Sequence, residues 1–453
     1  MTTLQPRHFQ PERTEMTMGH PTTYREVFAV AEYRTMFTAG LGSQLGDQAA
    51  AVALAVLLYQ RTGSPLVAAL GYATAYLPWT IGGMVLSPLA DRIAPRTLLV
   101  GCDLARAVLI GLAAIPGMPL PLVGAFVLVA AFFSPPFEAA HASLLPRVLG
   151  ADRYPVGLSI GNAVHQSTQL TGFLVGGALV ALISADGALA LNAVSFALSG
   201  LLLRRGLVVR PAAITLDDAA AITLDDAAAG AAADVPARGL LSRMLAETTQ
   251  GLRVVAADRR RYGPLLLGAA GAAYVIVPEA IAPAYVHTLG LGAPAVGAVM
   301  ASTAAGTVLG NLLLGRLATT VRRRDLMWPM AFAGTLPLFA VLSRPGLAVS
   351  LVLFGLAGAA GAFQVAANTA FVDAVPVAVR GRAFGVAMTG MYGAQALAIV
   401  AAGAAASAFN ASTVVVGAAV LGALALIVLR GTALRSDAPV DLAVVTGRAE
   451  AVC

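Results

Sequence analysis

The sequence predicts an all-α polytopic membrane protein in which twelve transmembrane helices form two pseudo-symmetric six-helix bundles. The first reason is composition: 58% of the 453 residues are hydrophobic and 11% are charged, whereas a soluble domain is about 25% charged. The second reason is a series of apolar runs long enough to cross a bilayer, which takes about 20 helical residues each. The third is a segment that occurs in both halves of the chain.

This repeated segment ends the second and the eighth apolar runs. Residues 87–92 read SPLADR and residues 315–320 read GRLATT, and basic residues follow each of them. The same pattern at the same place in two six-helix halves indicates an internal repeat, which is typical of membrane transporters. The two copies also set the register in which the helices of one half correspond to those of the other.

Short polar turns, or turns with Pro and Gly, separate most of the apolar runs. We expect membrane spans over residues 35–60, 66–89, 97–117, 120–145, 155–183, 187–203, 262–286, 294–318, 326–343, 346–374, 382–408 and 411–430. They divide the chain into an N-terminal tail (1–30), a first bundle (31–204), a connecting segment (205–261), a second bundle (262–430) and a C-terminal tail (431–453).

The connecting segment has two features of its own. AITLDDAA occurs twice in succession, at 213–220 and 221–228, which we interpret as a duplication in a tolerant linker. Apolar residues between Leu241 and Val255 recur at helical spacing, which predicts an amphipathic helix on the membrane surface.

The distribution of arginine predicts the orientation of the chain. With the N-terminus inside, nearly all arginines fall in or beside cytoplasmic segments, and only Arg61 and Arg344 face outside. The positive-inside rule therefore predicts a multi-pass protein of the inner (plasma) membrane with both termini in the cytoplasm. The first residues have no apolar core or cleavage site, so we do not expect a signal peptide.

The motif between the second and third spans, together with the six-plus-six arrangement, resembles the major facilitator superfamily. The superfamily's loop pattern is roughly G-x-L-A-D-R-x-G-R-R. In this chain Leu89, Ala90, Asp91, Arg92 and Arg96 match it, whereas other residues replace both glycines. The resemblance implies a gating motif at the inner side of the two halves, made of Asp91, Arg92, Arg96, Arg380 and Arg382.

Further segments resemble the enterobactin-exporter and macrolide-efflux branch of that superfamily. They are Gly46-Asp47, residues 62–65 (TGSP), 103–106 (DLAR), 171–177 (TGFLVGG) and 380–385 (RGRAFG). At Thr171-Gly172 many drug antiporters carry Gly-Pro instead. The branch implies a twelve-helix exporter of small amphipathic molecules, usually coupled to protons.

Four ionisable side chains within the predicted spans are candidates for proton coupling: Asp47, Glu138, His165 and Glu279. An aspartate at the centre of a membrane helix costs roughly 2.5–3.5 kcal/mol on insertion scales, so such groups mark functional sites by default. The repeat register places Glu279 within one helical turn of the position equivalent to Asp47. A carboxyl group that faces each side of the membrane in turn can take up and release a proton.

Each candidate also has a structural interpretation. Asp47 can be a hydrogen-bonded acid that supports the first helix, Glu138 can pair with Arg147, and His165 can be a neutral hydrogen-bonded histidine. For Glu279 the functional interpretation is favoured, because the prolines on both sides of it interrupt the helix and leave backbone carbonyls free.

Polar and aromatic side chains are expected to line a cavity between the bundles. The span over 155–183 carries a polar stripe at helical spacing, and such a face must avoid lipid. Aromatic side chains of the span over 66–89 can stack on an aromatic or cationic substrate, or can anchor the helix at the interface. The expected lining residues are Tyr72, Tyr76, Trp79, Asn162, Gln166, Gln169, Gln364, Asn368, Tyr392 and Gln395.

These features favour a neutral or cationic amphipathic substrate over a strongly anionic one, since no arginine is expected at the centre of the cavity. Asp103 and Arg106, three residues apart, are expected to form a local pair, and the resemblance implies that their span lies on the periphery of the first bundle. No G-x-x-x-x-G-K-[ST] loop occurs, so ATP is not expected to drive the process. The expected partners are the lipid bilayer, a small-molecule substrate and protons; we expect a monomer with no metal, cofactor or nucleic acid.

The sequence is therefore interpreted as that of a proton-coupled exporter, and not of an enzyme. Two alternatives stay open. The same fold and acids permit proton-linked or passive uptake of a small nutrient. The second alternative is a protein that does not transport, either a receptor or a membrane-embedded enzyme. Against an enzyme, the chain has neither an HExxH nor a GxSxG motif.

Overall fold

In the computed structural model, residues 22–80, 93–211, 249, 251–317, 320–376 and 379–436 are described, and every regular element within these ranges is a helix. The first half contains α1 (Tyr24–Ala29), α2 (Ala31–Thr62), α3 (Pro65–Ala73), α6 (Pro95–Ala113), α7 (Leu120–Ala131) and α8 (Ser134–Gly206). The second contains α11 (Arg259–Val275), α12 (Val277–Ala280), α13 (Ala282–Thr288), α14 (Ala293–Leu317), α15 (Thr320–Ala333), α16 (Leu336–Ala340), a 3₁₀ turn (Val341–Ser343), α17 (Leu347–Ala360), α18 (Phe363–Ala374), α19 (Arg380–Ala408) and α20 (Ala411–Ser436).

The 73-residue helix α8 is three helices in sequence. Gly150 (φ 71°) and Ser184 (φ 72°) interrupt it with backbone angles that no helix has. Glycine tolerates such angles because it has no Cβ, whereas the serine is an exception to that rule. Both breaks fall between predicted spans, so the helix turns back through the membrane at each of them.

Among the described residues, eight helical segments are long and apolar enough to cross a membrane, and one of them, Leu120–Gly206, has 87 residues. A single crossing takes about 20 residues, so this segment accounts for several. The chain is a multi-pass helical membrane protein, as predicted. The described helices are compatible with twelve spans, and that number stays a prediction.

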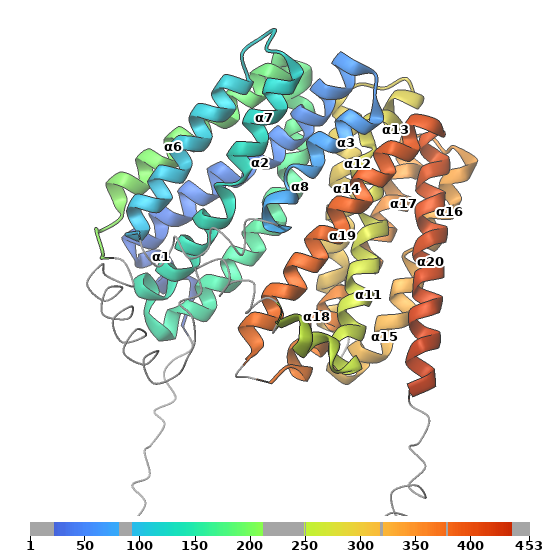
Figure 1. Cartoon of the computed structure of the whole chain (residues 1–453). Coiled ribbons are helices and arrows are strands. Elements are labelled where there is room, and N and C mark those ends of the chain that lie inside the picture. Colours follow the sequence, from blue (N-terminus) through green and yellow to red (C-terminus); the bar gives the residue numbers. More distant parts are fainter. Residues whose placement is uncertain are drawn as a thin grey trace, which may run out of the picture.

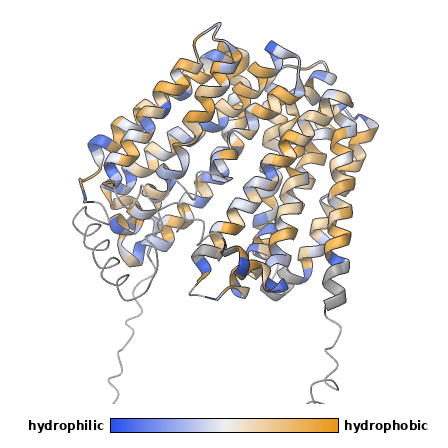
Figure 2. Cartoon of the chain, viewed as in Figure 1, coloured by the Kyte–Doolittle hydropathy of each residue, from blue (hydrophilic) through white to orange (hydrophobic). Residues whose placement is uncertain are grey.

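The outer surface of the helices carries the side chains expected next to lipid (Figure 2). Leu182, Leu397 and Leu421 are exposed by 69–79%. In water such a surface would be costly, but in a bilayer it is the favourable one. Small residues bring helices together inside the halves: a Cβ added to Gly306 or Gly310 of α14 would overlap the backbone of α17, which is typical of membrane helix packing.

The two halves form two groups of helices that converge toward one face of the molecule (Figure 1). We call this the far face; the connection from α2 to α3 lies there (Figure 1). At the opposite face, called the termini face, the described chain begins with α1 and ends with α20 (Figure 1). Glu32 at the start of α2 and Arg210 just after α8 form an ion pair of 2.6 Å at the termini face.

Candidate functional site at the interface of the two halves

Glu279 lies where the first helix of the second half is broken into three pieces. Pro278 and Pro283 open α12 and α13, and Ile281 between these helices has non-helical angles. Proline causes such breaks because it lacks an N–H and its ring clashes with the preceding turn. Glu279 is 4% exposed, so the break carries a carboxyl group into the core.

The partner of this carboxyl group belongs to the other half. The hydroxyl of Tyr72 in α3 donates a hydrogen bond of 2.7 Å to Oε2 of Glu279. No ion pair of Glu279 is found among the residues that the structure describes. A single neutral hydroxyl therefore holds the acid, and the bond joins the two halves.

Aromatic side chains extend this contact. The hydroxyls of Tyr72 and Tyr76 are 3.4 Å apart. The ring of Tyr76 lies 6.2 Å from that of Tyr392 in α19, and Tyr392 stacks on Trp79 with ring centroids 5.6 Å apart. We call Tyr72, Tyr76, Trp79, Glu279 and Tyr392 the interface cluster. Sequence reasoning named all five but did not predict that they would meet.

Other contacts between the halves join α3 to α19, where a Cβ added to Gly403 would lie 3.1 Å from Cα of Leu66, and join α8 to α14. A Cβ added to Gly177 of α8 would lie 2.8 Å from the carbonyl oxygen of Ala293 and 3.1 Å from Cα of Gly297, both in α14. The rings of Tyr59 and His287 are 5.6 Å apart. In this structure the halves are thus joined from the far face to the level of the interface cluster, within the described part of the chain.

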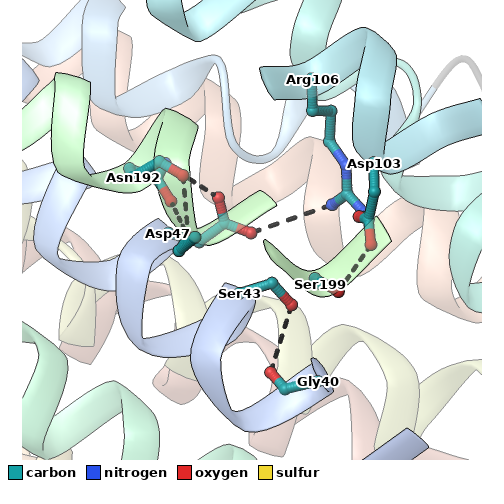
Figure 3. Close-up of polar contacts among 8 residues, drawn as sticks. Gly40, Ser43, Asp47, Asp103, Arg106, Asn192 and Ser199 are labelled. Atoms are coloured by element: carbon teal, nitrogen blue, oxygen red, sulfur yellow. Dashed lines mark hydrogen bonds and ion pairs between the residues drawn. The ribbon is translucent and has the colours of Figure 1, made fainter. Parts of the chain in front are cut away.

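A second group of polar residues lies inside the first half (Figure 3). Nη2 of Arg106 is 2.5 Å from Oδ1 of Asp103, and Nη1 is 4.0 Å from Oδ2 of Asp47. The other oxygen of Asp103 accepts a bond of 2.6 Å from Ser199. Asn192 reaches Asp47 at 3.4 Å. The Asp103–Arg106 pair was expected from the sequence, and the structure contains it.

Its surroundings correct one expectation. Asp103 is 0% and Arg106 is 5% exposed, so the pair is buried within the first half and does not lie on its periphery. Arg106 also lies 4.0 Å from Asp47, a contact that the sequence analysis did not predict. The sequence did contain a sign of this buried polar group. Asn192, Ser195 and Ser199 recur at i, i+3 and i+7, which places them on one face of a helix.

The other candidates on α8 are spread along it. Glu138 and the polar residues Asn162 and His165 are exposed, whereas Gln166 and Gln169 are partly buried. Glu138 forms no ion pair with Arg147 among the described residues, so that alternative is not supported. Glu138 interacts electrostatically with both Asp47 and Tyr392.

In the second half, Gln364 and Gln395 are partly buried and Asn368 is exposed. No hydrogen bond or ring contact is found between them and the interface cluster in the described ranges. Their expected role in lining a cavity stays a prediction, as does that of the polar stripe on α8.

The predicted gating motif is only partly visible. Asp91 and Arg92 lie outside the described residues, as do the duplicated AITLDDAA segment and most of the predicted amphipathic helix; the side chain of Arg382 is not described either. Arg96 donates a hydrogen bond to the carbonyl oxygen of Arg204, and Arg380 bonds the carbonyl oxygen of Val375 at 3.5 Å. Both bonds stay within one half, so the gating role stays a prediction.

The helices form two groups, one from each half of the chain (Figure 1), and comparisons with known proteins show that this is the major facilitator fold. The family model described as Major Facilitator Superfamily matches residues 264–441. The "Uncharacterized MFS-type transporter YkuC" of Bacillus subtilis (strain 168) is 26% identical over 185 residues, which are 40% of this chain and 42% of that protein. The match thus spans less than half of the relative's length.

Solved structures cover more of the chain. A POT family transporter in complex with a thioalcohol-conjugated peptide is 12% identical with a TM-score of 0.66, and the match covers 89% of this chain and 96% of that one. The nucleoside transporter NupG is 14% identical with a TM-score of 0.65, covering 88% and 99%. At these identities the structures show the fold. The family model and the relative add a similarity in sequence over part of the chain.

Proposed function

We propose that this chain is a secondary active transporter that exports a small amphipathic molecule, neutral or cationic, in exchange for protons by alternating access. It would act as a monomer in the plasma membrane with both termini in the cytoplasm. The observation that carries the proposal is the hydrogen bond between Tyr72 and Glu279, which places a buried acid at the contact between the two halves.

The bond links the charge of Glu279 to the contact between the halves. A charge that leaves water for a low-dielectric interior costs several kcal/mol unless it is paired. Glu279 has one hydroxyl partner, and that partner moves away when α3 separates from α12. The closed contact therefore suits the carboxylic acid, and an open one, with water present, suits the carboxylate.

Alternation then couples the proton to the substrate. When the halves separate at the far face, Glu279 meets water on that side and exchanges its proton there. When they close, the acid is enclosed again at the contact between the halves. Rocking of two similar halves around a central site is how repeats of this kind transport.

The orientation rests on the arginines, and the export direction rests on the sequence resemblance to the enterobactin-exporter and macrolide-efflux branch. Of the solved structures named above, one is a transporter in complex with a conjugated peptide and the other is a nucleoside transporter, so uptake of a small nutrient is the second candidate. The two differ in the direction of the proton: exchange moves it against the substrate, and uptake by symport moves it with the substrate.

The test uses purified protein in liposomes with an imposed pH gradient. Ethidium serves as the cationic probe and chloramphenicol as the neutral one, and protein-free liposomes give the background. Exchange predicts that an acid interior drives accumulation of at least one probe. Accumulation with an acid exterior would establish symport in its place. No gradient-driven transport of either probe, in protein that retains its fold, would contradict the proposal.

A further inference from the structure

The second half contains a groove between α19 and α20 with a volume of about 480 Å³. Tyr274 of α11 and Val277 of α12 form its floor, since they line the groove and are 2% and 3% exposed. Ten of the sixteen lining residues are alanine or glycine, and none is charged within the described part of the chain. A lining of this kind suits a hydrocarbon ligand, because a polar or charged one would find almost no partner there.

The floor of the groove cannot move up to fill it. A Cβ added to Gly422 of α20 would lie 2.7 Å from Cδ1 of Tyr274, so α20 already packs closely on this ring. The hydroxyl of Tyr274 donates a hydrogen bond of 2.7 Å to the carbonyl oxygen of Ala331. The ring is held at both ends and its hydroxyl has a partner. The alanines and glycines of the walls are too short to fill the groove in its place.

The groove runs along the helices and has the length of one lipid leaflet. On α20 the lining residues Thr413, Gly417, Leu421 and Ala425 recur every four positions, which places them on one face of the helix. Twelve residues separate Thr413 from Ala425, or about 18 Å along the axis. One leaflet of the hydrocarbon core is about 15 Å thick. Because α20 begins at the far face (Figure 1), the groove lies in the leaflet on that side.

The groove is continuous with the lipid-facing surface of the protein. Leu421 and Phe409 line it and are 69% and 64% exposed, and Leu397 of α19 beside it is 72% exposed. These large side chains form the rim and face the bilayer, so the bilayer supplies the occupant. An empty apolar groove would forfeit the dispersion contacts of its walls, and a lipid chain that enters it restores them.

The rim also argues against a second copy of the protein as the occupant. Membrane helices associate where small residues form the outermost surface and let two backbones approach. In this groove the small residues lie below the rim, and the side chains that project from it are Leu421 and Phe409. A partner helix is about 10–12 Å wide with its side chains and would rest on the rim, whereas a single chain enters.

We propose that this groove binds one straight acyl chain of a phospholipid of the far-face leaflet and retains it more firmly than the surrounding lipid. The inference goes beyond the proposed function and holds for either direction of transport. It gives the chain a place behind a contact of the two halves. Ala402 of α19 lines the groove, and the next residue, Gly403, packs on α3 of the first half.

The test uses the full chain in liposomes with a trace of a phosphatidylcholine that carries a diazirine on a straight palmitoyl chain. The host lipid is either diphytanoylphosphatidylcholine or palmitoyl-oleoylphosphatidylcholine, with the same fraction of label. The methyl branches of a phytanoyl chain widen it, so it competes poorly for a groove that is walled on three sides. Mass spectrometry of peptides locates the label after illumination.

In the branched host we expect the groove to be labelled at least fivefold more than the lipid-facing surface of α6 at Leu104 and Val108, which are 46% and 63% exposed. In the straight-chain host the labelling of the groove should fall at least fivefold, while that of α6 stays the same. Equal labelling of the two surfaces, or labelling of the groove that does not depend on the host, would overturn the inference. This comparison needs no variant.

Gly417→Leu locates the site. Gly417 lines the groove, and a Cβ there would meet nothing within 4 Å, so the leucine fills the groove without displacing a neighbour. The matched control is Gly124→Leu in α7, where a Cβ also meets nothing within 4 Å and which does not line the groove. Gly417→Leu should lose the excess labelling in the branched host, and Gly124→Leu should keep it. Equal excess in both variants would contradict a site in this groove.

A second copy as the occupant has its own readout. In a chain with Cys453→Ser, Thr413→Cys places a thiol at the far-face end of the groove, where it is exposed. We expect no disulfide-linked dimer after mild oxidation in liposomes. Efficient formation of a dimer, together with loss of the labelling in the groove, would assign the groove to a protein contact and overturn the proposal of a lipid chain.

Discussion

Tyr72 and Tyr274 make the same kind of bond in two different settings. Both are buried, and each donates a hydrogen bond of 2.7 Å, Tyr72 to Glu279 and Tyr274 to the carbonyl oxygen of Ala331. Only the first of these bonds joins the two halves. Removing each hydroxyl in turn therefore distinguishes a role of Tyr72 in coupling from the general effect of losing a buried hydrogen bond.

Tyr72→Phe and Tyr274→Phe should therefore destabilise the protein by similar amounts, about 1–3 kcal/mol, because each leaves a buried acceptor without its donor. Only Tyr72→Phe should change the ratio of protons to substrate in the liposome assay. Thermal unfolding checks the first expectation. A coupling ratio that is equal in the two variants would mean that the bond to Glu279 has no role in coupling.

Asp103 and Asp186 are a second matched pair of residues. Asp103 is the fully buried partner of Arg106, whereas Asp186 pairs with Arg61 at 3.1 Å near the surface. Asp103→Asn leaves a buried guanidinium without its counter-ion, which costs about 3–5 kcal/mol. Asp186→Asn should cost about 0–1 kcal/mol. Thermal unfolding of both variants measures the difference, and equal melting temperatures would contradict the burial argument.

The sequence predicted which residues belong to the polar sites better than it predicted which of them are in contact. Local spacing predicted the Asp103–Arg106 pair, because partners three residues apart lie on the same face of a helix. The bond between Tyr72 and Glu279 joins residues 207 positions apart, and no local pattern contains it. The contact of Arg106 with Asp47 depends on the meeting of α6 and α2 and was missed for the same reason.

At the level of helices, hydropathy and the positions of proline determine where most helices lie and where they break. Within the described residues the predicted spans fall on helices, since in a membrane each backbone N–H and C=O must be paired within its own helix. Proline explains the break around Glu279. The breaks in α8 at Gly150 and Ser184 follow the predicted turns. The close approach of α8 to α14 was not predictable, because it depends on which faces of the two helices meet.

That approach can be tested with two glycines of α8. Gly177 has no room for a side chain, whereas a Cβ at Gly161 would meet nothing within 4 Å. Gly177→Ala should force the far-face contact apart, at a cost of about 1–3 kcal/mol for overpacking, and should slow transport. Gly161→Ala should do neither. Melting temperature and initial rate of ethidium transport are the measurements, and equal values for the two variants would contradict this packing account.

For the molecule as a whole, the account requires that the far-face contact opens in every cycle. Tyr59 and His287 lie on opposite halves at this contact. A short bismaleimide linker between Tyr59→Cys and His287→Cys, in a chain with Cys453→Ser, should stop transport. Transport at the normal rate after complete cross-linking would rule out alternating access at this face.

The central claim is that Glu279 couples protons to transport, and Glu279→Gln tests it most directly in the ethidium assay. The variant keeps the size of the side chain and a hydrogen bond with Tyr72 but cannot release a proton. We predict that it no longer accumulates ethidium with an acid interior, yet still exchanges labelled for unlabelled ethidium at equal pH. Accumulation at the wild-type level would contradict the account.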